Sequence, residues 1–541
     1  MKTAINIALS TLSGLILSAS WPLIGNQTYL IFIALIPLLL MESRLSSSNK
    51  KWSALSVFLI SYPGFLIFNY VTTWWIKLAS PGGMVLAVVF NTLFMSLVFT
   101  CFHITKKWLG RGTGYWALII YWIAFEYLHI NWELSWVWLN LGNVFANDVT
   151  WIQWYEYTGV LGGSAWILLT NVFLFNVIAA IKEKRLVGIR RILWPLSYLS
   201  LLIIPLIVSN QLYTHYKEVE DPVEVLLLQP NIDPYNDKFS GMSEAAQIDK
   251  LMLLAQENIT LKTELVFGPE TAFPMSYWEH DLENVDGVKK VRNLIDKFPN
   301  ATFIVGLTSI RRYLNGEARS ETARPFSDGS GNYYDYYNTA MQIEFNCEPH
   351  LYRKSQLVLG VERMPFSGKL KFIEDLAIEL GGASGSLGIE KSPVVFHSES
   401  NDGRSIDVIP AICYESIYGE YLTEFVREGA NLIGVITNDG WWGDTPGYAQ
   451  HLSYSRMRAI ELRRDVARSA NTGISAIINQ RGDVLQQSQW WTTDALLGTV
   501  NLNSKLTFYA QHGDYIGRTA SFFAVLLVLW SIARKLRGKV F

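Results

Sequence analysis

Charge and cysteine are both scarce in this 541-residue chain. Charged residues make up 17% of it, against about 25% in an ordinary globular protein, and the formal net charge is −2. Because positive and negative charges are nearly equal in number, the chain lacks the excess of basic residues that a nucleic-acid-binding surface needs. Three cysteines, Cys101, Cys347 and Cys413, are too few for a disulfide framework, and no His or Cys spacing is typical of a metal site. We therefore predict no metal, no cofactor and no nucleic-acid partner.

Long apolar segments are abundant instead, since half of the residues are hydrophobic. A helix that crosses a bilayer needs about 20 apolar residues. Segments of this kind lie at residues 4–20, 28–42, 53–71, 82–102, 114–130, 162–181, 193–211 and 518–534. We predict eight transmembrane helices. The chain then divides into a membrane domain of seven helices (1–215), a soluble domain (216–512) and a last helix with its tail (513–541).

The basic residues predict how these segments are oriented. Lys and Arg gather after the second, fourth, sixth and eighth segments, and Lys2 precedes the first. The intervening loops 21–27 and 131–161 have none, and 72–81 has only Lys77. Because basic loops stay in the cytoplasm, both termini are predicted to be cytoplasmic. The soluble block then faces the periplasm, across the inner membrane of a bacterium.

Some residues of the apolar half admit two interpretations. The loop 131–161 is rich in Trp and is either an aromatic belt at the membrane interface or part of a substrate entrance. Glu126 lies inside the fifth segment, where an ionisable residue is costly and has either a structural or a functional role. Cys101 lies in an apolar segment, and we expect it to be buried.

The soluble block alternates short β-rich runs with polar helical stretches, which is typical of an α/β domain. Strands are predicted at 223–228, 265–267, 302–308, 339–345, 406–412, 432–437, 466–469 and 474–478, and helices at 243–261 and 451–464. Chemically capable residues follow several strands directly, at the position where open α/β sheets place their sites. The segment 361–390 is predicted to be a surface excursion that forms either a mobile lid or an inert loop.

Three residues far apart in the sequence make a complete set for acyl transfer. Glu270 stands in Phe-Gly-Pro-Glu-Thr-Ala-Phe-Pro, Lys354 in Leu-Tyr-Arg-Lys-Ser and Cys413 in Pro-Ala-Ile-Cys-Tyr-Glu. A thiol attacks only as thiolate, so Cys413 needs a base, and Glu270 serves if burial raises its pKa. Lys354 then favours the thiolate and stabilises the oxyanion, with the backbone N–H of Tyr414 as a second donor.

These settings carry a family resemblance. Pro269-Glu270-Thr271, Tyr352-Arg353-Lys354 and Ile412-Cys413-Tyr414-Glu415 resemble the three signature regions of the nitrilase superfamily, whose catalytic set is Glu, Lys and Cys. Together with the flanking membrane segments, nearly the full chain resembles the bacterial apolipoprotein N-acyltransferases, the membrane-embedded branch of that superfamily. The run after Lys354 departs from the better-known proteobacterial pattern, although Glu362 is retained.

The resemblance implies an αββα sandwich for the soluble domain and a two-step reaction. Cys413 would take an acyl chain from a membrane phospholipid as a thioester. The α-amine of the diacylglyceryl-cysteine at the N-terminus of an apolipoprotein would then receive it. A thiol suits this ping-pong chemistry because it persists as a covalent intermediate. The implied partners are the phospholipid donor, the lipoprotein acceptor and the bilayer, and we expect a monomer.

Several neighbours are expected to support the three catalytic residues. Glu362 is predicted to hydrogen-bond Lys354 or to help the proton transfers, with a structural salt bridge as the alternative. Glu415 is predicted to orient Cys413 or Lys354, or else to be purely structural. Asn438, with Asp439, is expected to brace the site. Further residues carry weaker expectations: Trp441 and Trp442 either line an acyl pocket or pack in the core, and Arg456 and Arg458 form internal ion pairs.

Two other functions compete with acyl transfer. A membrane-tethered amidase of the nitrilase type would use the same three residues, but it would not need so many membrane segments around a soluble substrate. A transporter or channel with an outer binding domain would need polar residues deep in its membrane segments, and these segments contain few. The pattern favours the acyltransferase.

Overall fold

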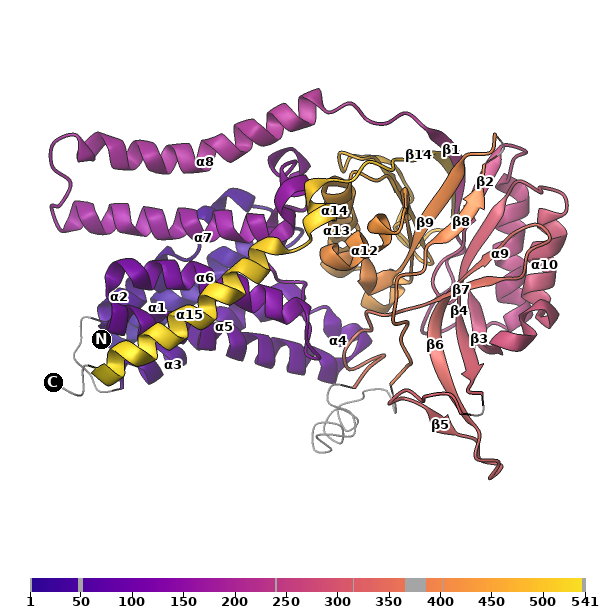
Figure 1. The fold of residues 1–541 in the computed structure, drawn as a ribbon, viewed down its shortest axis with the longest axis horizontal. Helices are drawn as coiled ribbons and strands as arrows, with labels where there is room; N and C mark the ends of the chain where they lie inside the picture. The colour runs from indigo at the N-terminus through magenta and orange to yellow at the C-terminus, as the bar shows by residue number, and fades with distance from the viewer. Residues whose placement is uncertain are drawn as a thin grey trace. The chain divides into compact units, whose positions relative to one another are not determined.

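The computed structural model describes residues 2–46, 52–238, 241–314, 316–364, 386–400 and 402–537. These residues form two compact units. The first comprises Met1–Lys77, Met84–His215 and His512–Phe541, and the second comprises Leu78–Gly83 and Tyr216–Gln511. Each unit has its own architecture, helical in the first and α/β in the second (Figure 1).

The first unit is built from apolar helices. Its long helices are α1 (Lys2–Ser20), α2 (Ile36–Ser46), α3 (Ser53–Thr73), α5 (Pro81–Leu109), α6 (Arg111–Ile130), α7 (Tyr155–Lys182), α8 (Arg190–His215) and α15 (Tyr515–Arg537), joined in part by the short α4 (Ile76–Ala79) and the 3₁₀ turns η1 (Thr28–Phe32), η2 (Leu141–Phe145) and η3 (Val149–Trp151). Among the described residues, seven helical segments are long and apolar enough to cross a membrane. The predicted fifth span falls on α6, a 20-residue helix that is not one of the seven. The predicted class of a helical membrane domain is therefore confirmed, but the predicted number of eight transmembrane helices is not.

The ambiguous residues of this unit take mainly structural places. Trp138, in the aromatic loop, is buried and packs against Trp75 with ring centroids 4.9 Å apart and the ring planes tilted by 57°, so this tryptophan neither faces lipid nor lines an entrance. Glu126 is buried and accepts hydrogen bonds from Trp122 Nε1 (3.0 Å) and from the backbone N–H of Leu141 (2.8 Å), which favours its structural interpretation. The expected burial of Cys101 is wrong, because this residue is exposed on α5.

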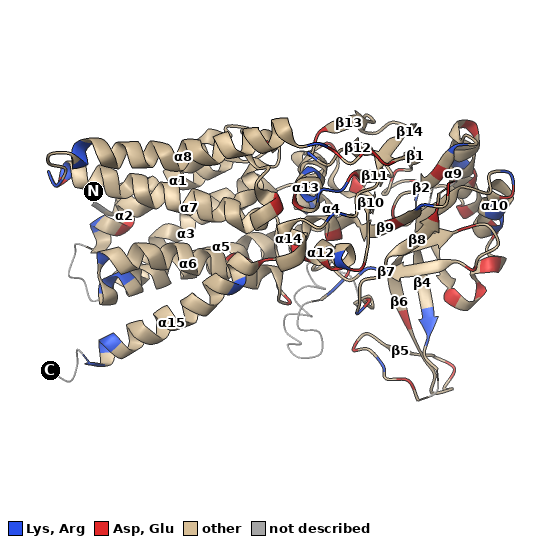
Figure 2. Ribbon diagram, turned by 45° about the horizontal axis from the view of Figure 1, so that its top comes forward, with Lys and Arg blue, Asp and Glu red and all other residues tan. Residues whose placement is uncertain are grey.

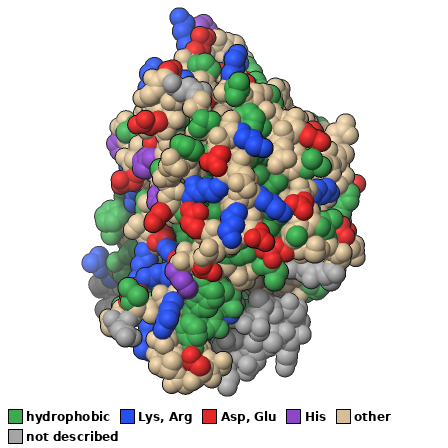
Figure 3. Space-filling view, turned by 90° about the vertical axis from the view of Figure 1, so that its right-hand side faces the viewer, with side chains coloured by type: hydrophobic (Ala, Val, Ile, Leu, Met, Phe, Trp, Pro, Cys, Tyr) green, Lys and Arg blue, Asp and Glu red, His purple; other side chains and the backbone are tan. Residues whose placement is uncertain are grey.

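Charged side chains are sparse along the membrane helices and gather at their ends. Figure 2 shows Lys and Arg where α7 joins α8 and at the end of α15. Those residues are Lys182, Lys184, Arg185, Arg190 and Arg191 at the first place, and Arg534, Lys535 and Arg537 at the second. The surface of the second unit in Figure 3 differs, since acidic and basic side chains are interspersed there.

The second unit begins with an eight-stranded mixed sheet. Its order is β14-β1-β2-β4-β6-β5, with β3 pairing with β4 and β7 with β6. The strands are β1 (Pro222–Gln229), β2 (Thr263–Phe267), β3 (Phe273–Trp278), β4 (Thr302–Arg312), β5 (Arg324–Pro325), β6 (Tyr333–Ile343), β7 (His350–Arg353) and β14 (Asp494–Asn501). Strands β1, β2 and β4 run parallel, so their carboxyl ends meet at one edge.

A second sheet has six strands in the order β13-β12-β11-β10-β9-β8. Its strands are β8 (Phe396–Glu399), β9 (Ser405–Ile412), β10 (Leu432–Thr437), β11 (Val466–Ala470), β12 (Ala476–Ile478) and β13 (Val484–Gln487). The central strands β9, β10 and β11 are parallel, and every residue of β10 and β11 is buried. Such continuous burial is typical of a sheet that is covered on both faces.

The two sheets pack face to face between helices. Successive side chains of a strand alternate between faces, so Leu226 joins the cluster with α9 (Glu244–Asn258) and α10 (Asp286–Ile295), and Val225 joins the cluster with the second sheet. A Cβ on Gly434 of β10 would lie 2.6 Å from the ring of Phe267 in β2, so this glycine lets the sheets approach. Helices α12 (Gly419–Arg427) and α13 (Pro446–Leu462) cover the second sheet, which confirms the αββα sandwich.

Candidate active site

Cys413 lies at a sharp turn directly after β9. It begins the 3₁₀ turn η5 (Cys413–Ile417), and its φ of +50° is in the left-handed region, which is costly for a residue with a side chain. Hydrogen bonds hold the turn, because Ser416 Oγ donates to the Cys413 carbonyl (2.8 Å) and His451 Nε2 lies 3.1 Å from the same oxygen. The thiol residue is only 7% exposed. A strained turn fixed from several sides presents this side chain in one orientation.

Glu270 lies in a similar tight turn, between β2 and β3. The next residue, Thr271, has a φ of +48°, and the backbone N–H of Gly306 in β4 donates to Pro269 O at 3.1 Å. A side chain on Gly306 would not fit, since its Cβ would lie 2.6 Å from the Cα of Glu270. The sequence thus needs a glycine in the neighbouring strand to bring the turn of Glu270 against the sheet.

The carboxylate of Glu270 is held by three donors. Its Oε1 accepts from Asn338 Nδ2 at 2.7 Å and from Lys354 Nζ at 3.4 Å. Its Oε2 accepts from the backbone N–H of Asn438 at 3.2 Å. Glu270 is 7% exposed, so these contacts replace water around it. The predicted base and the predicted ammonium group are therefore paired in the structure.

Lys354 follows β7 and lies between two carboxylates. Its Nζ is 3.0 Å from Oε1 and 2.9 Å from Oε2 of Glu362, and only 1% of its side chain is exposed. Burial alone would lower the pKa of Lys354, but the nearby charges of Glu362 and Glu270 raise it above its ordinary value. Lys354 is therefore an ammonium group at neutral pH, poised to meet developing negative charge.

The thiol of Cys413 is affected by the same charged groups. Burial raises its pKa above the ordinary value, the charge of Glu270 raises it further, and Lys354 opposes both effects. The resting residue is consequently a protonated thiol at neutral pH, and it needs a base to become a nucleophile. Glu270, Lys354 and Cys413 thus act on one another electrostatically.

Glu415 connects the two halves of the site. Its Oε2 accepts from the backbone N–H of Ile412 (2.9 Å), and its Oε1 accepts from the backbone N–H of Ser355 (2.7 Å) and from Tyr352 Oη (2.6 Å). It therefore ties the residue before Cys413 to the residue after Lys354. Burial raises the pKa of Glu415 to about 7, while its hydrogen bonds lower it.

The other expected neighbours surround this centre. Tyr414 is buried, with its ring centroid 5.2 Å from that of Tyr418. The side chain of Asn438 accepts from Asn471 Nδ2 (3.1 Å), which fixes the residue whose backbone binds Glu270. Among the two arginines of α13, Arg458 pairs with Glu461 at 2.9 Å, as predicted. The predicted lid falls mostly on residues 365–385, which lie outside the described residues.

Sequence reasoning missed three residues that touch the site. Asn338, in β6, donates to both Glu270 and Glu362 (2.8 Å) through one amide nitrogen. Lys238 is 5% exposed, contacts Thr271 Oγ1 and lies 3.5 Å from the carbonyl of Glu270. His451 joins the Cys413 carbonyl to Asp439, whose Oδ1 is 2.9 Å from His451 Nδ1 and whose other oxygen pairs with Arg468. Their partners are distant in sequence, so no local pattern reveals them.

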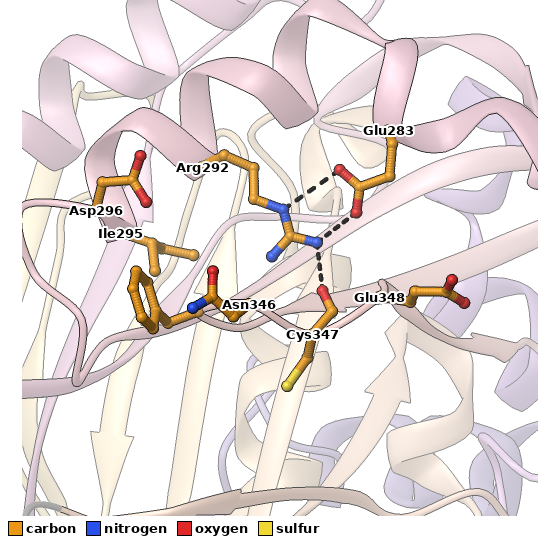
Figure 4. A pocket seen from close by; sticks show the side chains of 8 residues that line it. Glu283, Arg292, Ile295, Asp296, Asn346, Cys347 and Glu348 are labelled. Atoms are coloured by element: carbon orange, nitrogen blue, oxygen red, sulfur yellow. Dashed lines mark hydrogen bonds and ion pairs between the residues drawn. The ribbon is translucent and has the colours of Figure 1, made fainter.

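A separate pocket of about 270 Å³ lies beside α10 (Figure 4). Cys347 lies here, in the turn between β6 and β7, as its sequence context predicts. Arg292 donates to Glu283, in the turn η4 (Glu279–Asn284), and to the carbonyl oxygen of Cys347. The basic side chain of this pocket is therefore already engaged, and the lining residues come from the surface of the sandwich and not from the Cys413 site.

The fold and the site define a nitrilase-like domain that accompanies a membrane unit, and two family models match the corresponding parts of the chain. Residues 227–505 match the Carbon-nitrogen hydrolase family, and residues 13–173 match the family of the Apolipoprotein N-acyltransferase N-terminal domain. Among solved structures, an amidase from Nesterenkonia sp. is 16% identical, with a TM-score of 0.35, over 55% of this chain and 95% of that one.

Similar proteins extend over nearly the whole length. An apolipoprotein N-acyltransferase of Chlorobaculum tepidum is 31% identical over 538 residues, which covers 97% of this chain and 96% of that protein. One of Geobacter metallireducens is 26% identical over 520 residues, 94% of this chain and 91% of that protein. The chain belongs to the apolipoprotein N-acyltransferase family.

Proposed function

We propose that this protein moves a fatty-acyl chain from a membrane phospholipid to the α-amine of the N-terminal diacylglyceryl-cysteine of apolipoproteins, through a thioester on Cys413. The observation that carries the proposal is the position of Lys354, whose Nζ lies between Glu270 (3.4 Å) and Glu362 (2.9 Å) and whose charge acts on the buried thiol. Base, electrophilic cation and nucleophile are thus assembled in one desolvated place, in a chain of this family.

The first step forms the acyl-enzyme. Glu270 takes the proton of the Cys413 thiol, and the thiolate attacks the ester carbonyl carbon of the phospholipid. Lys354 Nζ and the backbone N–H of Tyr414 stabilise the oxyanion of the tetrahedral intermediate. When the intermediate collapses, the C–O bond breaks, and the lysophospholipid alkoxide leaves with the proton held by Glu270.

The second step transfers the acyl chain to the acceptor. The α-amine of the diacylated cysteine attacks the thioester carbonyl carbon, and Lys354 again meets the charge on oxygen. Glu270 takes a proton from the attacking nitrogen, the C–S bond breaks, and the Cys413 thiolate recovers that proton. An amide and a free thiol result. Burial of the thiol supports this sequence, because water excluded from the site cannot hydrolyse the thioester.

The supporting residues receive roles consistent with their contacts. Glu362 holds the Lys354 ammonium group, since it accepts from Lys354 and from the backbone N–H of Val358 at 2.8 Å. Glu415 fixes the backbone before Cys413, and Asn438 places a backbone donor on Glu270. The tethered amidase is not favoured, because the family match includes the membrane unit as well as the catalytic domain.

The proposal also covers the membrane topology of the protein, its division into domains and its monomeric state. Residues 216–512 form the catalytic domain in the periplasm, residues 1–215 and 513–541 anchor it in the inner membrane, both termini are cytoplasmic and the protein acts as a monomer. The alternating basic loops support this orientation. A reporter fused near residue 350 is expected to signal periplasmic exposure, and a cytoplasmic signal would contradict the topology.

The decisive experiment is the intact mass of the purified protein after incubation with phospholipid vesicles, with Cys413→Ala beside the wild type. We expect a hydroxylamine-labile fatty-acyl adduct on the wild type only, which a diacylglyceryl-cysteine peptide then removes as its N-acyl product. An adduct that discharges only to water would instead support the tethered amidase. Absence of any adduct on the wild type would refute the thioester mechanism.

A further inference from the structure

An apolar groove lies among α6, α7 and α8 of the membrane unit. Its volume is about 420 Å³, within the range of roughly 300–1,000 Å³ that is common for ligand sites. Its walls are mainly apolar, with Trp116 and Ile119 from α6, Leu169 and Phe173 from α7 and Leu201 from α8. A groove of this composition along membrane helices suits a hydrocarbon chain.

One end of the same groove is positively charged. Arg111, the first residue of α6, and Arg185, just after α7, both line it. They share one carboxylate, because Glu183 pairs with Arg111 Nη1 at 2.9 Å and with Arg185 Nε at 2.6 Å. Two guanidinium groups against one carboxylate leave a net positive charge. Their side chains remain 40% and 48% exposed, so a ligand can reach them.

The surrounding sequence adds to this charge. The segment 182–191, which connects α7 to α8, carries five basic residues and one acidic residue. A guanidinium group binds phosphate oxygens through paired N–H donors, which makes a cluster of this kind complementary to a phosphate. Basic sites between membrane helices at the cytoplasmic ends of the spans are where anionic lipid headgroups bind.

Helix α8 packs loosely, which explains why side chains do not fill the groove. Of its 26 residues only Ser209 is buried. The contacts of α8 with α7 include a hydrogen bond from Trp166 Nε1 to Leu201 O at 2.8 Å, and the rings of Trp194 and Tyr198, whose centroids lie 6.3 and 6.5 Å from that of Phe173. Pro195 and Pro205 lie inside α8, where each removes a backbone donor. The space between a well-packed pair of helices and this third helix is left for lipid.

We propose that this groove binds one anionic phospholipid, with an acyl chain along α6 and α7 and its phosphate at Arg111 and Arg185. The lipid lies at the end of the spans where the basic loops gather. It serves as a bound structural lipid and not as the acyl donor. The proposal is independent of the catalytic residues, since none of them lines the groove.

Native mass spectrometry of the full, delipidated protein in detergent tests the proposal. The probes are diether phosphatidylglycerol and diether phosphatidylcholine, which lack a transferable ester and so cannot acylate Cys413. We expect phosphatidylglycerol to bind preferentially. Arg111→Gln/Arg185→Gln should lower its occupancy roughly tenfold or more, because each basic residue near an anionic headgroup contributes about fivefold. Leu169→Trp, which fills the groove and keeps its charge, should lower the occupancy of both lipids.

A matched control removes the same charge elsewhere. Arg534→Gln/Arg537→Gln acts on the last turn of α15, outside the groove, and should leave the occupancy unchanged. If the occupancy of phosphatidylglycerol falls equally in this control and in the groove variant, the effect is one of general surface charge, and the proposal is overturned. Wild-type occupancy in the groove variant, or equal binding of both lipids by the wild type, would also overturn it. Thioester formation on Cys413, measured separately, tests the catalytic proposal alone.

Discussion

His451 Nε2 lies 3.1 Å from the carbonyl oxygen of Cys413. A carbonyl only accepts, so this contact needs a proton on Nε2. The ring is fully buried, and its other nitrogen lies 2.9 Å from Asp439 Oδ1. The strained turn that presents the proposed nucleophile is therefore supported by a buried chain of polar groups that begins at Arg468, a residue of β11.

His451→Ala should slow acylation of Cys413 by about 10- to 100-fold, because the loss of one partner of a buried polar group costs about 1–3 kcal/mol. We expect kcat to fall with little change in KM, since His451 acts through the turn and not on substrate. Alkylation of the Cys413 thiol by iodoacetamide at fixed pH should slow as well. Ser416→Ala, which removes the other side-chain donor to the same carbonyl, is the matched comparison. Normal alkylation and turnover in His451→Ala would exclude the positioning role.

Glu270→Gln should abolish thioester formation while the fold persists. The amide keeps the size of the side chain and an acceptor for Asn338, but it cannot take the thiol proton. Burial raises the pKa of Cys413, so little thiolate forms without a base, even though the substitution removes the further rise that the Glu270 charge causes. We expect thioester formation to slow by at least about 10³-fold, because the variant loses both the general base and the charge beside Lys354. Glu257→Gln, a change of the same kind on α9, is the control, and normal acylation in Glu270→Gln would remove Glu270 as the base.

The three catalytic candidates could be found from the sequence because each stands in a distinctive setting just after a strand. The fold of the membrane unit followed from hydropathy, whereas the sandwich required the family resemblance. Asn338 could not be found, since it lies inside a strand and its partners come from two distant loops. The same holds for His451, which is an unremarkable polar residue of α13 until the fold brings it to Cys413. Cys101 was misjudged because apolar residues of a membrane helix can face lipid instead of protein.

Lys238 predicts a change of activity near pH 8. Burial lowers its pKa to about 8, although the charge of Glu270 opposes this shift. Above that pH the side chain loses a positive charge beside the turn of Glu270, and negative charge developing in the transition state is stabilised less. The rate of Cys413 acylation should therefore fall several-fold as the pH rises from 7 to 9.

The ionisation of Lys238 affects the stability of the fold in the opposite direction to its effect on activity. A lysine whose folded pKa is lowered binds fewer protons in the folded state than in the unfolded state between pH 8 and 10.5, so its unfavourable contribution is relieved as the pH rises through this window. Two variants of Lys238 test the predicted pH dependence of activity. Lys238→Arg should keep the charge and so flatten the activity profile above pH 7. Lys238→Met should lower the rate at pH 7 and should flatten the profile as well. The same fall above pH 8 in all three proteins would assign the titration to another group.

Asn338→Asp should damage the site more than Asn338→Ala does. The amide nitrogen of Asn338 donates to Oε1 of Glu270 (2.7 Å) and to Oε1 of Glu362 (2.8 Å), and its carboxylate replacement would face both with like charge. One of the three carboxyl groups must then take up a proton at neutral pH, since like charges so close cannot all ionise in a buried place. If Glu270 shares that proton, the base is lost for part of the time.

We expect acylation of Cys413 to fall about 100-fold in Asn338→Asp and about 10-fold in Asn338→Ala. The rate of Asn338→Asp should recover in part as the pH rises and the extra proton leaves. The pH profile of thioester formation separates this effect from misfolding, because a misfolded site would not recover. An Asn338→Asp protein with the same rate and profile as Asn338→Ala would show that Asn338 only fills space beside Glu270.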